Sequence, residues 1–319
     1  MLTLVKSYLL LGSVLLIGGG VTAYAVAPEL TATGRALRRR IGWGAITGAG
    51  LLLVGSALDI VLTLLGAIGS LSSELTYSYL TSTRHGHAVL VRTVLVVLLL
   101  PLTLWLVHYA TNRSTANAAA RGRHNWVVGI YLVASFLLLG TFSYTSHAAA
   151  MGGTPPLMAD LAHFAAATVW AGPLLYLALV PDWHEPYQAG LQVAFKRVSF
   201  IGLLSVLTLF ATGIYTTLIH LQEPVRFATS PYGFALYAKV TLVLVIVGLA
   251  TVNRFWLLPA FLQCGAARFK KAVRIEGVLL AAVLIATGIL TTSALPHGSG
   301  PPDAWANLIN LLNLLKGNL

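Results

Sequence analysis

The sequence contains very little charge for its length. Of its 319 residues, 9% are charged and 57% are hydrophobic, whereas a soluble domain usually carries roughly 25% charged residues. Nine acids and twenty bases are too few to cover the surface of a soluble protein of this size. We therefore exclude a soluble fold and expect lipid to be the solvent for most of the chain.

Cysteine and the signature motifs of common enzymes are also scarce or absent. Cys264 is the single cysteine, which excludes an internal disulfide framework, a CxxC redox pair and a thiolate metal cage. The sequence has no GxxxxGK[ST] loop, no HExxH and no aspartyl-phosphate motif. We expect neither an enzyme nor an ATP-driven pump. Any bound metal must be held by His, Met, carboxylate or backbone oxygen.

What the sequence does contain is long apolar runs. A bilayer core of about 30 Å needs about 20 apolar residues in a helix to cross it, and the backbone must be helical because lipid offers it no hydrogen-bond partner. The prediction is an all-α polytopic membrane bundle of about eight transmembrane helices. The runs cover residues 8–27, 41–69, 88–110, 125–145, 157–180, 198–221, 232–253 and 275–295.

The bases are concentrated in alternate connections between these runs. Those in the first, third, fifth and seventh connections are Arg35, Arg38, Arg39, Arg40, Arg113, Arg121, Arg123, Lys196, Arg197, Arg254, Arg268, Lys270, Lys271 and Arg274. The other side has Lys6, Arg84, Arg226 and Lys316. By the positive-inside rule the basic connections are cytoplasmic and both termini are extracytoplasmic. The net charge of +11 thus reflects topology, and we expect no nucleic-acid partner.

The first run raises the alternative of a cleaved signal peptide. Ala25-Val26-Ala27 has the small residues of a cleavage site, but Pro28 would follow the cut. Cleavage would also leave the Arg35–Arg40 cluster on the wrong side of the membrane. We therefore predict that this run is a retained helix.

Potential soft-metal ligands gather on the side opposite the basic connections. They are His85, His87, His147, His163 and Met151; histidine suits both copper oxidation states and methionine suits Cu(I). His163 is expected about 9 Å inside the fifth helix, where a polar side chain is often functional. The alternatives remain that His163 only braces two helices through Asp160 or a carbonyl, and that the loop histidines are simply solvated.

Charged side chains inside the helices form a second set. Asp59 and Arg92 are expected to pair between the second and third helices, which would lower the burial penalty of both. Glu276 is expected to pair with a nearby cytoplasmic arginine, Arg254 or Arg274. Lys239 has Asp160 as a candidate partner, and its role is left open between structure and function.

Short motifs follow one another in a fixed order between residues 140 and 297. They are Asp160-Leu-Ala-His163, Trp170-Ala-Gly172, Phe195-Lys-Arg197, Ala211-Thr-Gly213, Pro231-Tyr-Gly233, Leu236-Tyr-Ala-Lys239, Asn253-Arg254 and Arg274-Ile-Glu276. In this order and spacing they resemble the bacterial copper-resistance D (CopD) family of membrane proteins. One departure is Ala171-Gly172-Pro173, where the family usually has a Gly-Gly pair after the tryptophan.

This resemblance implies a multi-pass protein of the bacterial inner membrane that transports or handles copper, most simply by uptake. The division it suggests is a three-helix segment at 1–124, a CopD-like core at 125–297 and an amphipathic interfacial tail at 298–319. Some family members carry a fused copper-binding β-domain; none is seen here, so a separate extracytoplasmic copper-binding protein is the expected donor.

The expected ligands for a copper ion are His147, His163, His87, His85 and Met151. Asp160, Trp170 and Lys239 are expected to support them, with Asp160 orienting His163 through its other ring nitrogen. Two other functions remain open. Paired histidines would also suit a b-type haem protein that transfers electrons, and the same ligands would suit a copper chaperone for oxidase assembly.

Overall fold

Helices make up all the regular structure of the described residues. The computed structural model describes residues 1–28, 31–112, 118–150, 153–180, 188–220, 229–260 and 266–293. Eight helices in this part are long and apolar enough to cross a membrane, which confirms the predicted bundle. They are α1 (Leu2–Val21), α2 (Ala32–Ile68), α4 (Arg84–Asn112), α5 (Ala118–Ser143), α7 (Thr154–Ala178), α8 (Gln188–His220), α10 (Pro231–Val252) and α11 (Ala266–Thr292).

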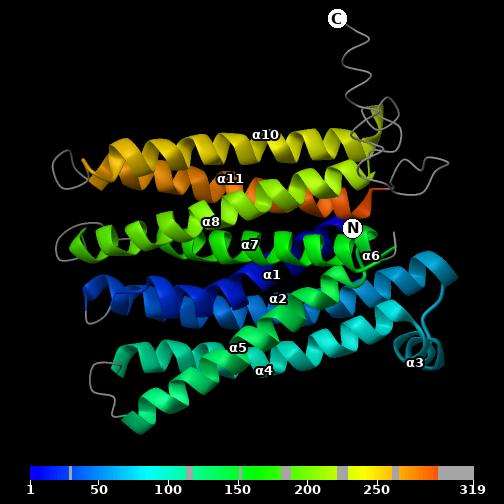
Figure 1. The fold of residues 1–319 in the computed structure, drawn as a ribbon. Coiled ribbons are helices and arrows are strands. Elements are labelled where there is room, and N and C mark those ends of the chain that lie inside the picture. The colour runs from blue at the N-terminus through cyan, green and yellow to red at the C-terminus, as the bar shows by residue number, and fades with distance from the viewer. Residues whose placement is uncertain are drawn as a thin grey trace, which may run out of the picture.

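Several shorter elements were not expected from hydropathy. Two π-helical turns, η1 (Thr22–Val26) and η3 (Asn253–Leu257), extend α1 and α10. The short helices α3 (Ser73–Ser82) and α6 (His147–Ala150) lie in connections at one end of the bundle (Figure 1). α3 begins where the Ser72 side chain accepts a hydrogen bond from the Leu75 amide. Serine is one of the preferred residues at this N-cap position.

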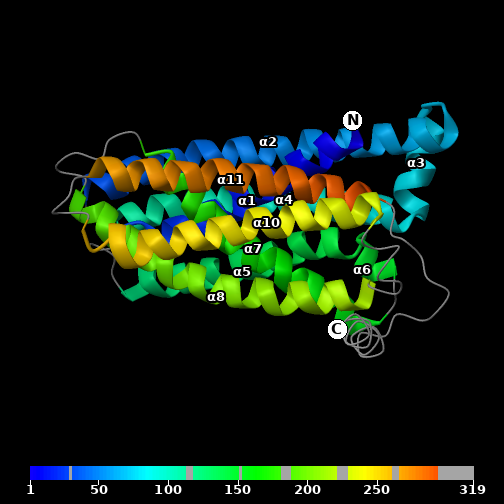
Figure 2. The ribbon, with the colours of Figure 1, turned by 90° about the horizontal axis from the view of Figure 1, so that it is seen from above.

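α1 lies in the middle of the bundle (Figures 1 and 2), packed against α2, α4, α7 and α11. Its most apolar stretch is 67% buried within the protein, a larger share than in any other span of the described residues. The first run is therefore a central helix of this fold, and its retention in the mature protein stays a prediction. Buried residues of α1 contribute to two apolar clusters, one shared with α8, α10 and α11 and the other shared with α4 and α5.

Glycines allow α1 to approach its neighbours closely. A Cβ added at Gly18 would lie 2.5 Å from the Cα of Gly172 in α7, and one added at Gly12 would lie 2.8 Å from the carbonyl oxygen of Gly48 in α2. Helix association in lipid depends on such close packing of small residues, because lipid provides little hydrophobic drive between helices. These two crossings fix α1 against α2 and α7.

Two tyrosines reinforce the position of α1. The Tyr131 hydroxyl of α5 donates to the carbonyl of Ile17, and the Tyr176 hydroxyl of α7 donates to the carbonyl of Leu15 over 2.8 Å. A buried hydroxyl without a partner is costly, so these bonds stabilise the two aromatic side chains in place. They join the two later helices to the backbone of the first.

The end of the bundle that carries most arginines and lysines is called the basic end below; it comprises the starts of α2, α8 and α11 and the end of α10. Several of its bases hold the fold together. Arg38 reaches the carbonyl of Pro28 over 3.5 Å, and Arg197 reaches the carbonyls of Val26 and Ala27 over 3.4 Å. Cations here complement the negative end of the helix formed by α1 and η1.

The other end of the bundle, called the opposite end below, contains the start of α1 and the end of α11. The hydroxyls of Thr3 and Thr292 lie 3.0 Å apart there. α3 and α6 lie at this end as well (Figure 1). The positive-inside rule predicts that it faces away from the cytoplasm. The predicted tail at 298–319 lies outside the described residues.

Candidate metal-binding site

The opposite end holds two clusters of polar side chains. The first, called the His163 cluster, consists of Asp160 and His163 of α7, Thr212 of α8 and Lys239 of α10. The second, called the Asp59 network, consists of Lys6 of α1, Asp59 of α2, Tyr79 of α3 and His85 of α4. Each cluster joins side chains that are distant in the sequence, and each contains residues that the sequence analysis marked as candidates.

Three members of the His163 cluster lie at a common depth. His163, Thr212 and Lys239 are each eight or nine residues from the end of their helix at the opposite end, which corresponds to about 12–14 Å along the helix axis. The cluster is therefore well inside the apolar layer.

The hydrogen bonds of Thr212 determine which nitrogen of His163 carries the proton. The Nδ1 atom of His163 lies 3.0 Å from the Thr212 hydroxyl. That hydroxyl has one hydrogen, which it donates to the carbonyl of Thr208 over 2.6 Å. With its hydrogen on that carbonyl, the hydroxyl is left as the acceptor for the ring, and the carbonyl of Leu209 is a further acceptor for His163. We assign the proton of the neutral ring to Nδ1.

This assignment leaves the Nε2 atom of His163 with a lone pair. No described residue donates a hydrogen bond to that atom. A neutral histidine whose other nitrogen is held by a hydrogen bond is the usual form of a histidine metal ligand. The ring is thus prepared to bind a metal ion without giving up any hydrogen bond found in the structure.

Asp160 occupies a different position from the one expected for it. Thr212 takes the place on Nδ1 of His163 that the sequence analysis assigned to Asp160. Asp160 instead interacts electrostatically with Lys239 and Tyr232, without a salt bridge of 4.0 Å or less anywhere in the described chain. A cation that approaches His163 would be attracted by the negative charge of Asp160 and repelled by the positive charge of Lys239.

Trp170 lies two turns farther along α7 than His163, toward the basic end. It is 6% exposed, and a Cβ added at Gly202 of α8 would lie 3.1 Å from its indole Nε1. The indole therefore fills the space where α7 and α8 approach each other. Its contribution is to hold these two helices together beneath His163.

The Asp59 network is a connected set of charged and polar groups. The Lys6 ammonium lies 2.7 Å from Asp59 Oδ2, and His85 Nε2 lies 3.1 Å from the same oxygen. Tyr79 Oη lies 2.8 Å from the other ring nitrogen of His85. Asp59 is only 1% exposed, so these partners offset the penalty of burying its charge.

Both ring nitrogens of His85 are occupied by this network. Burial raises the pKa of Tyr79, and the negative charge of Asp59 raises it further, so Tyr79 remains a phenol. In a neutral His85, Tyr79 donates to Nδ1 and Nε2–H donates to Asp59; in a protonated His85, both nitrogens are donors. Neither form leaves a lone pair for a metal ion.

His87 differs from His85 in this respect. It is exposed, and its Nε2 atom lies 2.7 Å from the backbone carbonyl of Thr81. A carbonyl only accepts, so Nε2 carries the proton and Nδ1 has the lone pair. Of the two histidines in the His-x-His pair, His87 is the one that is open to a ligand.

The expected ion pair between Asp59 and Arg92 is not formed. Arg92 Nε donates to the Thr141 hydroxyl over 3.1 Å, and its guanidinium lies 3.8 Å from the centre of the Phe142 ring. That prediction was wrong because Lys6 reaches Asp59 from the central helix α1, a neighbour relation that hydropathy does not reveal. Asp59 Oδ1 and Arg92 Nη1 are each buried without a hydrogen bond.

The expected salt bridge of Glu276 is also absent from the described residues. Glu276 Oε1 accepts from the Asn253 side chain over 2.6 Å, and Arg254 donates to the backbone and side chain of Ser199 over 2.9 and 2.8 Å. Asn253 begins the π-helical turn η3, which sets the direction of its side chain. A neutral amide thus satisfies this buried carboxyl in place of an arginine.

The remaining predicted ligands fall where the structure gives no side-chain detail. His147 begins α6, which packs against α7, but its side chain and the whole of Met151 lie outside the described residues. Among the described side chains, no three His, Cys, Asp or Glu groups gather as a metal site. The convergence of His147, Met151 and His163 stays a prediction.

Comparison with known proteins adds family information for the second half of the chain. Residues 192–290 match the family model of copper resistance protein D. The match covers less than half of the chain and shows that this segment is similar to copper resistance protein D. The family resemblance drawn from the sequence motifs is thereby confirmed over α8, α10 and most of α11. No curated protein and no solved structure shows a significant match.

The match to copper resistance protein D includes part of the His163 cluster. Thr212 and Lys239 lie inside the matched range, whereas Asp160 and His163 precede it. Eight helices that are long and apolar enough to cross a membrane indicate a multi-pass membrane protein, and the matched segment is similar to a copper resistance protein. Thr212 was not predicted as a partner of His163; the Ala211-Thr-Gly213 motif was the available signal.

Proposed function

We propose that the protein carries copper across the bacterial inner membrane, from the opposite end toward the basic end. The observation that supports this most strongly is the hydrogen bond between Nδ1 of His163 and the Thr212 hydroxyl inside the apolar layer, from which we assign a lone pair to Nε2. A histidine in this state binds copper in either oxidation state.

Capture at the surface is proposed for His87. Its Nδ1 lone pair is exposed at the opposite end, where a copper-binding donor protein would deliver the ion. His147 and Met151, in the connection that precedes α7, are proposed to complete the surface ligands. His85 is left out of this set, because Tyr79 and Asp59 occupy its ring nitrogens.

The charges around His163 support passage of a cation rather than permanent storage. Asp160 attracts an incoming ion and Lys239 repels it, and the two side chains interact with each other. A bound copper ion would compete with Lys239 for Asp160. Binding at His163 is therefore expected to be tight enough for capture and weak enough for release.

The test of this proposal is substitution of Thr212 in the purified full-length protein. Thr212→Val removes the acceptor for Nδ1–H and should weaken Cu(I) affinity by roughly 10–100-fold, the usual effect of losing a hydrogen-bond partner of a ligand histidine. Thr212→Ser keeps the hydroxyl and should restore most of the affinity. Competition with a coloured Cu(I) chelator measures both variants.

Two results would contradict the proposal. Equal copper affinity in Thr212→Val and Thr212→Ser would show that the hydroxyl does not prepare His163 as a ligand. A Soret absorption band in the protein purified from cells would indicate that haem, not copper, is held by the histidines.

A further inference from the structure

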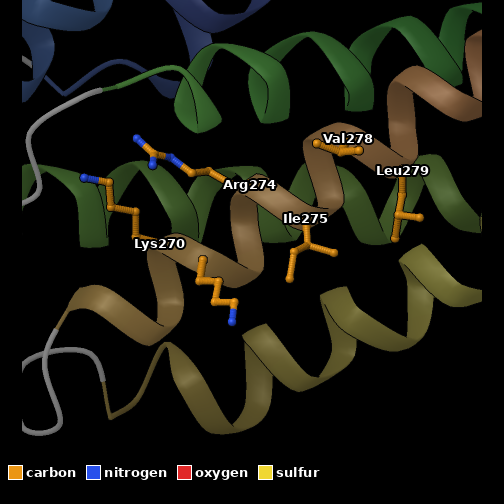
Figure 3. Close-up of a pocket in the computed structure, with 6 residues that line it drawn as sticks. Lys270, Arg274, Ile275, Val278 and Leu279 are labelled. Carbon is orange, nitrogen blue, oxygen red and sulfur yellow. The ribbon is translucent and has the colours of Figure 1, made fainter.

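A groove runs along α11 at the basic end, far from the His163 cluster. It has a volume of about 490 Å³, and its lining residues are Lys270, Lys271, Arg274, Ile275, Val278 and Leu279. These six residues are spaced as three adjacent pairs, four residues apart, which places them along one side of the helix. Figure 3 shows Lys270 and Arg274 extending toward the start of the helix, with Ile275 and Leu279 farther along.

The groove has a cationic half and an apolar half in that order. The three bases come first along the helix and the three aliphatic residues follow, over about 13 Å in total. No acidic side chain lines it. Ile275 and Val278 are 41% and 71% exposed on the protein surface, so in a membrane they contact lipid chains, while the bases lie nearer the headgroups.

Two of the three bases of this groove, Lys271 and Arg274, differ from others at the basic end. Arg38, Arg197 and Arg254 donate hydrogen bonds to backbone carbonyls and thereby hold helices together. By contrast, Lys271 and Arg274 form no hydrogen bond or salt bridge with the rest of the described chain. Their charges are not used by the fold, and they stand beside an apolar surface.

We infer that this groove binds an anionic phospholipid of the leaflet at the basic end. The phosphate would lie among Lys270, Lys271 and Arg274, and the beginning of an acyl chain would lie along Ile275, Val278 and Leu279. A zwitterionic lipid lacks the net negative charge that three cations favour, and a soluble anion does not use the apolar half. Basic pockets at the cytoplasmic ends of membrane helices are suited to such headgroups.

The first experiment compares two triple variants of the full-length protein in nanodiscs of phosphatidylcholine and phosphatidylglycerol. Native mass spectrometry measures the phosphatidylglycerol retained on the protein. Lys270→Gln, Lys271→Gln and Arg274→Gln together should lower its enrichment by on the order of tenfold or more. The matched control, Arg39→Gln, Arg40→Gln and Lys196→Gln, removes equal charge from the same end outside the groove and should retain the wild-type enrichment.

A second variant separates a lipid from a soluble anion. Val278→Asn makes the apolar half polar and should lower phosphatidylglycerol retention while the three cations remain. The inference is overturned if both triple variants behave alike, if phosphatidylcholine is retained as well as phosphatidylglycerol, or if inorganic phosphate displaces the lipid and Val278→Asn has no effect. The copper proposal does not depend on any of these outcomes.

Discussion

His163→Ala is expected to abolish high-affinity copper binding while leaving the fold intact. The substitution removes Nε2, the proposed ligand atom of the His163 cluster. The ring that carries this atom is held through Nδ1 by a hydrogen bond to Thr212 of the neighbouring helix α8. Because loss of a supporting partner alone weakens metal binding by roughly 10–100-fold, loss of the ligand itself should exceed about 100-fold. Competition with a Cu(I) chelator measures the affinity of the purified protein.

The matched control is His108→Ala. His108 lies on α4 near the basic end, away from the proposed path of capture, so its removal should leave the copper affinity unchanged. His85→Asn gives a second comparison: it disturbs the Asp59 network and should lower the melting temperature without lowering copper affinity. If His108→Ala weakens copper binding as much as His163→Ala, the ligand assignment is wrong.

Gly18→Leu is expected to prevent correct assembly of the bundle. Even the first added carbon would lie 2.5 Å from the Cα of Gly172, and neither backbone can move away because α1 is enclosed by α2, α4, α7 and α11. Overpacking of a well-packed interior usually costs about 1–3 kcal/mol and occasionally more. A backbone-to-backbone clash at the central helix belongs at the upper end of that range or beyond it.

The measurement is thermal unfolding and size-exclusion behaviour in detergent, with a graded series. Gly18→Ala should lower the melting temperature, and Gly18→Leu should give little monodisperse protein. Gly140→Ala is the control, since apart from the adjacent backbone of its own helix no atom lies within 4 Å of the Cβ it would add. If Gly18→Leu elutes and melts like the wild type, the close crossing of α1 and α7 does not hold the bundle.

The spans were predictable because hydropathy is a property of each segment alone. A helix in lipid must satisfy its own backbone and present apolar side chains, so all eight spans follow from the composition of the apolar runs. Pro101 and Pro173 fall inside α4 and α7 without ending either helix. α3 and α6 were missed because short interfacial helices have neither the length nor the hydropathy of a span.

The neighbours of each helix were not predictable from one sequence. Asp59 was matched with Arg92 because both lie in the outer halves of consecutive helices, yet the central α1 brings Lys6 to that carboxylate. Glu276 was matched with arginines by proximity in sequence, yet Asn253 is its partner. Pairing across helices depends on packing angles and on glycine positions, which act together over the whole bundle.

The candidate ligands were predictable by residue type but not by chemical state. His85 and His87 are equivalent in sequence, two residues apart on the same side of the membrane. Their hydrogen bonds make them different, because His85 has no lone pair to offer and His87 has one at Nδ1. The tautomer assigned to His163, which leaves a lone pair on Nε2, likewise depends on Thr212, which lies 49 residues away in the chain.

Copper flux into proteoliposomes tests the central claim most directly. The full-length protein is reconstituted with the basic end inside, its orientation is checked by labelling of accessible lysines, and a Cu(I) indicator is enclosed in the vesicles. The proposal predicts that copper added outside reaches the indicator faster with wild-type protein than with His163→Ala or with empty vesicles. Equal rates in all three would contradict passage of copper through this protein.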